Sequence, residues 1–201
     1  KKRCKIDKVY RIITKEWFYN YLYREYYVVS IGAITNVASA ILLNPEIRER
    51  IVVVWLGGHA RICADTKEFN MYQDYAAARV VMSQTNFVQL PCWEVVSEFS
   101  FTLPELEAVF SDKNRISDFL LENCREFFKE KEITDKVIWD VTAVAWLIND
   151  NNRFMEDEIT NVILPGYDGH YEEKPQQGLM CYVNKIHRKE LFEDMVRTVT
   201  K

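Results

Sequence analysis

Ile51-Val-Val-Val-Trp-Leu-Gly-Gly58 is the stretch that decides the fold. Its continuous apolar run, rich in β-branched residues, is typical of a parallel strand that is buried on both faces. Shorter runs of this kind occur at residues 27–31, 87–90 and 179–183. The segments between these runs have the spacing of amphipathic helices. We therefore predict an α/β fold with a mostly parallel sheet flanked by helices.

The expected helices follow from apolar spacing and from capping residues. Thr102 is a plausible N-cap, with Pro104 in the first turn of the helix that follows it. The other predicted helices lie at residues 36–43, 46–50, 74–83, 117–129, 141–148 and 188–199. No repeat, Ser-rich linker or charge block marks a boundary, so we predict a single α/β domain over residues 1–201.

The charge balance disfavours nucleic acid as a partner. The 201 residues include 26 Lys and Arg against 30 Asp and Glu, which gives a formal net charge of −4. Such a chain has no basic excess to offer a phosphate backbone. With 48% apolar residues, its composition is that of a compact soluble domain.

The cysteines and the apolar runs predict a cytoplasmic protein. No two cysteines have the C-x-x-C spacing of a zinc or redox site, so we expect reduced thiols. The five are Cys4, Cys63, Cys92, Cys124 and Cys181. No apolar run approaches the roughly 18 residues of a membrane-spanning helix, and the first residues do not have the pattern of a signal peptide.

Polar residues follow the predicted strands, where open parallel sheets bind their ligands. They are Thr35-Asn36 after the first strand, the loop over residues 57–70 after the second, and Trp139-Asp140 ahead of an apolar helix. The chain contains no G-x-S-x-G elbow, no Walker A loop and no G-x-G-x-x-G turn. A serine hydrolase or a dinucleotide-binding fold is therefore disfavoured.

These polar stretches carry a family resemblance. Ile31-Gly-Ala-Ile-Thr-Asn-Val-Ala38, Trp55-Leu-Gly-Gly58 and Glu68-Phe-Asn-Met-Tyr-Gln-Asp74 resemble, in order and spacing, motifs of the nucleoside hydrolases (inosine/uridine-preferring N-ribohydrolases). Trp139-Asp-Val-Thr-Ala-Val-Ala145 resembles a fourth family segment. The resemblance implies a Rossmann-like nucleoside hydrolase fold and a hydrolase that cleaves the N-glycosidic bond of ribonucleosides.

The resemblance also implies roles for individual residues. Thr35 would supply a main-chain carbonyl and Asp140 a carboxylate to a calcium ion that holds the attacking water, and both are oxygen ligands of the kind that calcium takes. Glu68 and Asn70 would be the catalytic and substrate-binding residues that hydrogen-bond the ribose hydroxyls. A small-molecule ribonucleoside would be the partner, and the family's habit implies a homo-oligomer.

The chain departs from the family pattern in ways that matter for the chemistry. The family's Asp-x-Asp-x-x-x-Asp-Asp string, which supplies the other metal carboxylates and the general base, does not occur here. Calcium takes roughly 6–8 oxygen ligands, so we expect the metal site of this chain to be incomplete and the chain alone to be inactive. Residues 1–25 resemble the helical stretch before the family's middle strand, so we expect the N-terminal strands to be missing; a truncated relative is the alternative.

Two substitutions bear on the base and the sugar. Trp139 stands where many members have the histidine that protonates the leaving base, and a purine-preferring subgroup has Trp there, stacked on the base. We therefore expect purine preference and a role for Trp139 in substrate binding. Ile62 stands near the position where the family often has an asparagine that reaches the ribose 5′-hydroxyl.

Simpler interpretations stay open for each residue. Asp140 and Thr35 could be ordinary caps, Glu68 and Asn70 solvated loop residues, and Trp139 a core residue. For the whole protein, the alternative to an enzyme is a non-catalytic relative that binds a ribosyl ligand and has lost the metal site. The third possibility is a structural or interaction domain.

Overall fold

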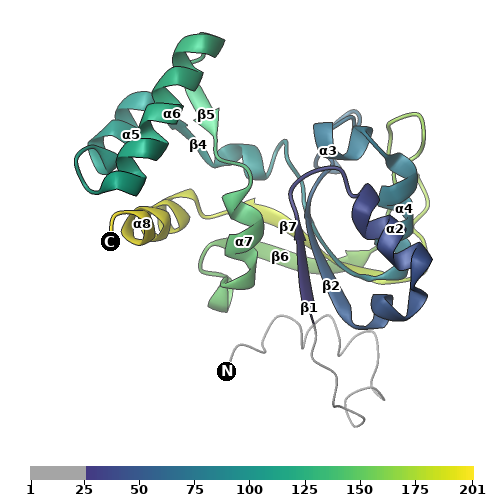
Figure 1. The fold of residues 1–201 in the computed structure, drawn as a ribbon. Coiled ribbons are helices and arrows are strands. Elements are labelled where there is room, and N and C mark those ends of the chain that lie inside the picture. Colours follow the sequence, from purple (N-terminus) through teal and green to yellow (C-terminus); the bar gives the residue numbers. More distant parts are fainter. Residues whose placement is uncertain (1–25) are drawn as a thin grey trace.

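A five-stranded sheet forms the centre of the molecule in a computed structural model that describes residues 26–201 (Figure 1). The strand order is β1-β2-β3-β7-β6, and only β6 runs antiparallel to its neighbour. The strands are β1 (Tyr26–Ser30), β2 (Ile51–Leu56), β3 (Asn86–Leu90), β6 (Met155–Asn161) and β7 (Leu179–Ile186). The mostly parallel α/β sheet is therefore confirmed.

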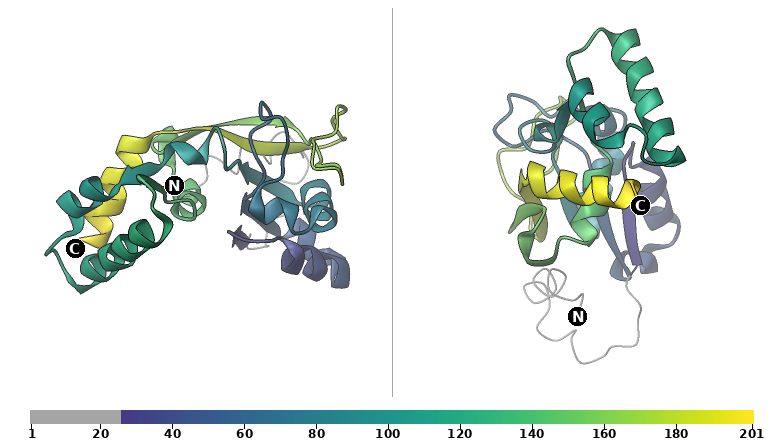
Figure 2. Two further views of the ribbon diagram at one scale, coloured as in Figure 1. Left: turned by 90° about the horizontal axis from the view of Figure 1, so that it is seen from above. Right: turned by 90° about the vertical axis from the view of Figure 1, so that its left-hand side faces the viewer.

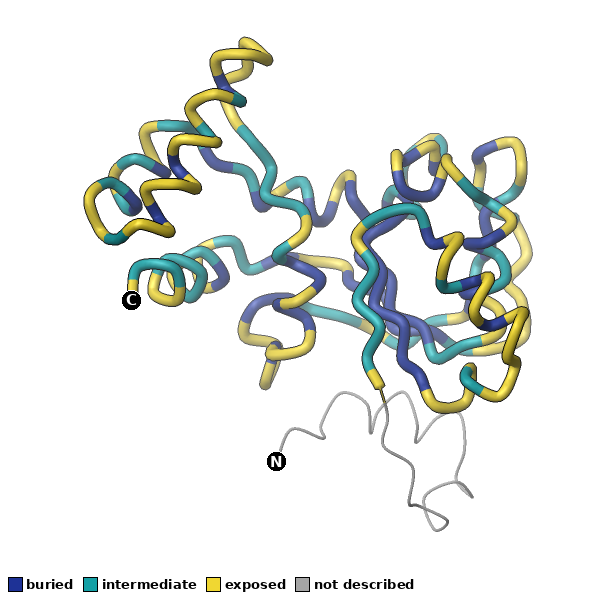
Figure 3. The backbone as a smooth tube through the Cα atoms, viewed as in Figure 1, coloured by how far each residue is buried: buried dark blue, intermediate teal, exposed yellow. Residues whose placement is uncertain are grey.

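Strand β2 lies in the middle of the parallel part, and all six of its residues are buried. Its side chains alternate between two apolar clusters, one on each face of the sheet. Val52, Val54 and Leu56 join one cluster, and Ile51, Val53 and Trp55 join the other. Burial on both faces explains why this strand has an unbroken apolar sequence. Figure 3 shows the buried central strands inside more exposed helices.

Helices cover both faces of the sheet. The elements between β1 and β3 are α2 (Thr35–Leu43), η2 (Pro45–Glu49), α3 (Phe69–Tyr72) and α4 (Tyr75–Gln84). Helices α2 and α4 pack on the face that contains Trp55, whereas α7 (Val141–Leu147) packs on the opposite face, against β1 and β2. The sheet is thus the middle layer of three.

A group of helices lies at one end of the molecule, away from α2 and α4 (Figures 1 and 2). It contains a two-stranded antiparallel ladder, and Phe101 of this ladder stacks on Phe192 of α8 with ring centroids 4.2 Å apart. The elements not yet named are η3 (Val96–Glu98), β4 (Ser100–Thr102), α5 (Leu103–Phe110), α6 (Arg115–Lys131), β5 (Asp135–Val137), η4 (Asp150–Asn152) and α8 (Arg188–Val199).

The capping prediction at Thr102 is confirmed. Its side chain accepts from the Glu105 backbone N–H while the Glu105 carboxylate accepts from Thr102, which is a capping box. The hydrogen bonds to Thr102 and Arg188 hold the pKa of Glu105 down to about 2. The start of α5 is therefore fixed by a local signal that the sequence shows.

The sequence did not predict every element. Strand β6 is rich in acidic residues and lies at the edge of the sheet, so it lacks the apolar signature of the other strands. Strands β4 and β5 have only three residues each, and α3 lies inside a segment predicted as loop. The prediction for residues 1–25 lies outside the described part of the chain. Among residues 26–201, no helix has the length and apolar character needed to cross a membrane.

Candidate active site

Glu68 organises the loop between β2 and α3. Its carboxylate accepts three backbone N–H groups: Asn70 at 2.9 Å on Oε1, and Gly58 at 2.9 Å and Met71 at 3.1 Å on Oε2. Two of these donors belong to the first turn of α3, so Glu68 is the N-cap of that helix. The third bond closes the loop back onto the end of β2, and the side chain is buried.

Asn70 is held beside the end of β2. Its Nδ2 donates to the Leu56 carbonyl at 2.9 Å, and only 8% of the residue is exposed. Its Oδ1 makes no hydrogen bond to another residue in the described part of the chain. The amide thus has one end anchored in the protein and an acceptor left for a ligand.

Phe69 points away from its two neighbours and is 76% exposed. An extended Glu68-Phe69-Asn70 triplet would give this alternation, but the segment is a helical turn capped by Glu68. The exposed Phe69 is therefore separated from its two buried neighbours by a capped turn and not by an extended backbone. The hydrogen bond from Gly58 N to Glu68 joins this turn to the end of β2.

Gly58 needs to be a glycine. Its φ is +78°, and an added Cβ would lie 2.6 Å from the Tyr171 hydroxyl oxygen. That hydroxyl donates to the His59 carbonyl at 2.9 Å and accepts from Gln89 Nε2 at 2.8 Å. Tyr171 therefore fixes the β2–α3 loop from a distant part of the chain, and burial raises the pKa of its hydroxyl.

Asp140 also stands at a helix N-terminus, but it does not cap the helix. It occupies the N-cap position of α7, and its side chain makes no capping hydrogen bond. Partial burial raises the pKa of this carboxyl, while the charge of Lys136 acts in the opposite direction. The simple capping interpretation therefore has no support, and the carboxylate is available to a ligand.

Cys92 lies just beyond β3, at the end of the neighbouring strand β2. Its backbone N–H donates to the Gly58 carbonyl at 2.7 Å, and α7 packs against β2. Burial is the largest cause that raises the pKa of its thiol, and the charges of Glu68 and Asp140 act in the same direction. The ends of β2 and β3 and the start of α7 therefore meet at one edge of the sheet.

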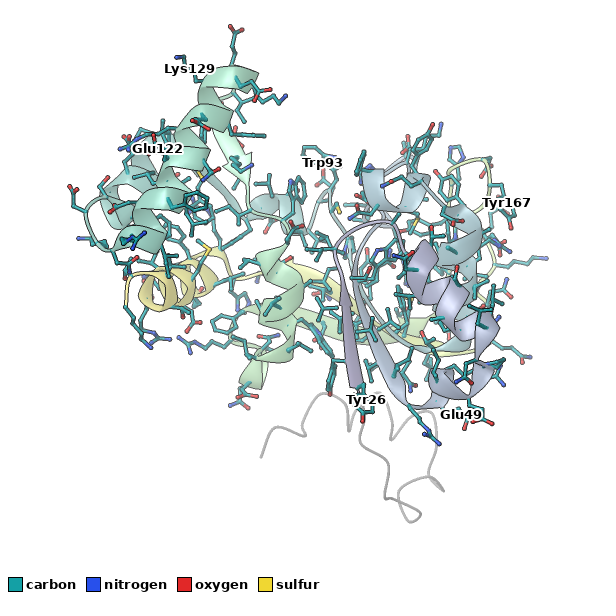
Figure 4. The ribbon with its side chains drawn as sticks, viewed as in Figure 1. Tyr26, Glu49, Trp93, Glu122, Lys129 and Tyr167 are labelled. Atoms are coloured by element: carbon teal, nitrogen blue, oxygen red, sulfur yellow. The ribbon has the colours of Figure 1, made fainter. Side chains whose placement is uncertain are left out.

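Two tryptophans stand at this edge. The rings of Trp93 and Trp139 make an edge-to-face pair with centroids 5.9 Å apart and planes at 78°. Trp139 is half-buried and packs against the core, whereas Trp93 is 53% exposed. In Figure 4, Trp93 lies at the end of the sheet opposite Tyr26, where β1 begins. An aromatic surface is thus present beside Asp140.

Thr35 is placed differently. It is the first residue of α2, and its hydroxyl donates to Asp74 Oδ2 at 2.7 Å, while Asp74 Oδ1 caps α4. No hydrogen bond within residues 26–201 joins Thr35 to Asp140 or Glu68. The side chain of Thr35 therefore ties two helices together, and the metal role of its carbonyl stays a prediction.

The described residues do not form a complete metal site. No group of three or more His, Cys, Asp or Glu side chains within residues 26–201 is arranged to hold an ion. Ile62, at the position expected for an asparagine, is 82% exposed. The aliphatic side chain of Ile62 cannot make the hydrogen bond to the ribose 5′-hydroxyl that an asparagine would make.

Sequence reasoning missed three residues of this edge. Cys92, Trp93 and Tyr171 lie in no motif, and their spacing in the chain gives no local signal. Only Trp93 offered a hint, because it lies three residues after the end of a predicted strand, where open parallel sheets bind their ligands. The other two depend on contacts between segments far apart in the sequence.

Comparison with known proteins agrees with this architecture. The structure is similar to the plant nucleoside hydrolase PpNRh1 (TM-score 0.72, 14% identity) and to an inosine-guanosine nucleoside hydrolase (TM-score 0.72, 17% identity). It is also similar to an inosine-uridine preferring nucleoside hydrolase from Bacillus anthracis (TM-score 0.70, 18% identity). The similarity covers 87%, 87% and 90% of this chain, respectively, but only 61% of each of the others.

The sequence comparisons add the family. No curated protein matches the chain. The sequence profile described as "Inosine-uridine preferring nucleoside hydrolase" matches residues 3–193, which is nearly the whole chain. Together with the three-layer fold and the ordered Glu68-Phe69-Asn70 and Asp140 segments at one sheet edge, this match shows that the chain belongs to the inosine-uridine preferring nucleoside hydrolase family.

Proposed function

We propose that this chain provides part of a site that hydrolyses the N-glycosidic bond of ribonucleosides. Water adds to the anomeric carbon and gives up one proton, the bond from that carbon to the base nitrogen breaks, and the base leaves with the electron pair of that bond and takes up one proton. The observation that carries the proposal is the Asp140 carboxylate, which has no hydrogen-bond partner within residues 26–201 and stands at the same sheet edge as the organised Glu68–Asn70 turn. An unpaired carboxylate held at a ligand-binding sheet edge is a functional arrangement more than a stabilising one.

Asn70 is the residue that we assign to the ribose. Its Oδ1 can accept from a sugar hydroxyl while its Nδ2 stays bonded to the Leu56 carbonyl. Such a bond contributes to catalysis if it shortens as the sugar flattens toward an oxocarbenium-like transition state. The fixed amide supplies orientation before the substrate arrives.

Glu68 mainly positions the β2–α3 loop, and we propose that its direct contact with the ribose is limited. Two carboxylate oxygens have about four lone-pair positions in all. Three are filled by backbone N–H groups, which leaves about one for a ligand. We propose that Glu68 accepts from at most one ribose hydroxyl.

Trp139 is the surface that we assign to the base. A base stacked on an aromatic side chain gains ~1–3 kcal/mol, and a half-buried indole loses little conformational freedom on binding. An indole cannot protonate the leaving base, so the base takes its proton from solvent. Purines accept a proton on the five-membered ring, and this supports a preference for purine nucleosides.

Calcium is implied by the family, and the described residues alone do not fit it. A calcium ion takes roughly 6–8 oxygen ligands, whereas Thr35 and Asp140 offer one carbonyl and one carboxylate. Asp140 has the right chemistry, because its carboxylate has no partner among the described residues. We therefore propose Thr35 and Asp140 as contributors to a site completed by other ligands, and no step here depends on the ion.

A base-release assay tests the proposal. The full-length protein is incubated with purine and pyrimidine ribonucleosides, with calcium and with a chelator, and the free base and ribose are measured. Release of both products by the wild type, and its loss in Asp140→Asn, is the expected result. Binding of nucleosides without release supports the non-catalytic relative instead, and neither binding nor release contradicts both.

A further inference from the structure

Trp93 has no place in the chemistry described so far, although it stands at the same sheet edge. It follows directly on Cys92, whose backbone N–H donates to Gly58 at the end of β2, and 53% of its surface is exposed. Large aromatic side chains are favourable when buried, so an exposed tryptophan beside a ligand site is a feature to explain. Exposure alone does not single out Trp93, because Phe119 is 68% exposed; the contact of Trp93 with Trp139 at the sheet edge does.

The geometry of the tryptophan pair is suited to a flat ligand. The planes of Trp93 and Trp139 meet at 78°, with ring centroids 5.9 Å apart. Two rings at nearly a right angle form a corner, so a planar molecule can lie flat on one ring while its rim contacts the other. Aromatic rings favour both stacked and edge-to-face contacts, and the corner offers one of each.

The backbone holds Trp93 in register with the loop that carries Glu68. The Trp93 carbonyl accepts from Ala60 N at 3.2 Å, and Cys92 N donates to the Gly58 carbonyl at 2.7 Å. Gly58 N in turn donates to Glu68. The indole is therefore fixed relative to the turn that presents Asn70.

The turn directly after Trp93 contains a residue in a strained backbone conformation. Glu94, the next residue, has φ = +67°, a left-handed conformation that a glutamate rarely adopts. A bond from Glu94 N to Ser97 Oγ at 3.1 Å holds this turn. Strain of this kind gathers at ligand sites, where the surrounding structure maintains it.

We propose that Trp93 is a specificity-determining residue, which forms with Trp139 an aromatic corner that holds the planar nucleobase by one stacked and one edge contact. This inference rests on the proposed function, because the nucleobase is the planar part of the proposed substrate. The polar sugar lies toward Asn70, outside the corner. Trp93 thus acts on the base and not on the ribose.

Binding of adenine and of D-ribose to the full chain, measured by calorimetry, tests the proposal without requiring turnover. Trp93→Ala should weaken adenine binding by about 2- to 13-fold, the effect expected for one aromatic contact. Trp93→Phe should retain most of the affinity, and neither change should alter ribose binding. Phe119→Ala is the matched control, because Phe119 is 68% exposed on α6 and should affect neither ligand.

The outcomes separate this inference from the proposed function. Adenine affinity that is unchanged in Trp93→Ala, equal losses for adenine and ribose, or no adenine binding by the wild type would each overturn the corner. Adenine binding that depends on Trp93 in a chain that releases no base supports the corner and contradicts the hydrolase. Base release together with an adenine affinity that does not depend on Trp93 supports the hydrolase and contradicts the corner. Circular dichroism of Trp93→Ala, Trp93→Phe and Phe119→Ala shows whether each variant folds.

Discussion

Glu68 and Asp140 each precede the first residue of a short helix, α3 and α7 respectively, at the same edge of the sheet. Glu68 is buried and accepts three backbone N–H groups, two of them from its own helix. Asp140 makes no capping bond, and partial burial raises the pKa of its carboxyl. Equivalent positions in the chain therefore differ: one carboxylate stabilises the fold, and the other makes no capping bond, as expected for the ligand role that we propose.

The largest expected effect separates the two residues by stability. Glu68→Ala removes the acceptor of three N–H groups and should lower the free energy of unfolding by about 2–4 kcal/mol. Asp140→Ala should change it by less than about 0.5 kcal/mol, as for most substitutions that break no such contact. Urea denaturation followed by circular dichroism measures both. Equal losses in the two variants would remove the distinction.

The next effect separates them by chemistry. Asp140→Asn should lower base release by about 100-fold, the scale of a preorganised charged or polar group, without loss of stability. Because the folded pKa of Asp140 is raised, the charged form disfavours folding above that pKa, and the penalty disappears once the pH falls below the unfolded value. At neutral pH the Asn variant should thus be as stable as the wild type or more so.

The pH dependence gives a check on the same residue. If the ionised carboxylate is the working form, base release by the wild type should decline as the pH is lowered. Because the pKa of Asp140 is raised, this decline should begin at a higher pH than the usual pKa range of an aspartate predicts. The stability difference between wild type and Asp140→Asn should shrink over that same range. A stability loss in the Asn variant at neutral pH would mean that Asp140 has a structural role after all.

Trp139→Ala sharpens the comparison on the ligand side. Loss of stacking should reduce purine nucleoside cleavage by about 5- to 150-fold and affect the slower pyrimidine reaction less. Product release from both classes of nucleoside, measured side by side, tests this. A uniform loss, or no loss, would identify Trp139 as a core residue, consistent with its packing against the apolar cluster.

The smallest expected effect concerns Asn70. Asn70→Ala should lower kcat by about 10-fold with little change in KM, if its bond to ribose tightens in the transition state. Gln73→Ala, on the exposed side of the same α3 turn, is the matched control and should leave both constants unchanged. A rise in KM with kcat intact would place Asn70 in ground-state binding only.

Much of the sheet could be predicted from sequence, because burial on two faces leaves an apolar run. Strands β2 and β3 were predicted at or within one residue of their observed bounds, as was the helix after Asp74. Strand β6 could not be predicted in this way. It is a sheet-edge strand with the sequence Met155-Glu-Asp-Glu-Ile-Thr-Asn161, so its pairing partner determines its conformation more than its own residues do.

The candidate site divides in the same manner. The motifs name Glu68, Asn70 and Asp140, but the motif does not reveal that Glu68 caps α3 while Asp140 leaves α7 uncapped. That difference depends on Gly58 N, which Tyr171 helps to place from a loop more than 100 residues away. Contacts over such distances in the chain leave no periodic or local pattern to read.

The reactivity of the buried Cys92 thiol can be used to measure local opening of the candidate site. Only a thiolate reacts readily with an alkylating reagent, and burial together with Glu68 and Asp140 keeps Cys92 protonated. Its labelling rate is therefore set by how often local opening exposes the sulfur. Because the chain has four other cysteines, the rate is measured by mass spectrometry on the peptide that contains Cys92, with and without a bound nucleoside, and it reports the opening of the sheet edge.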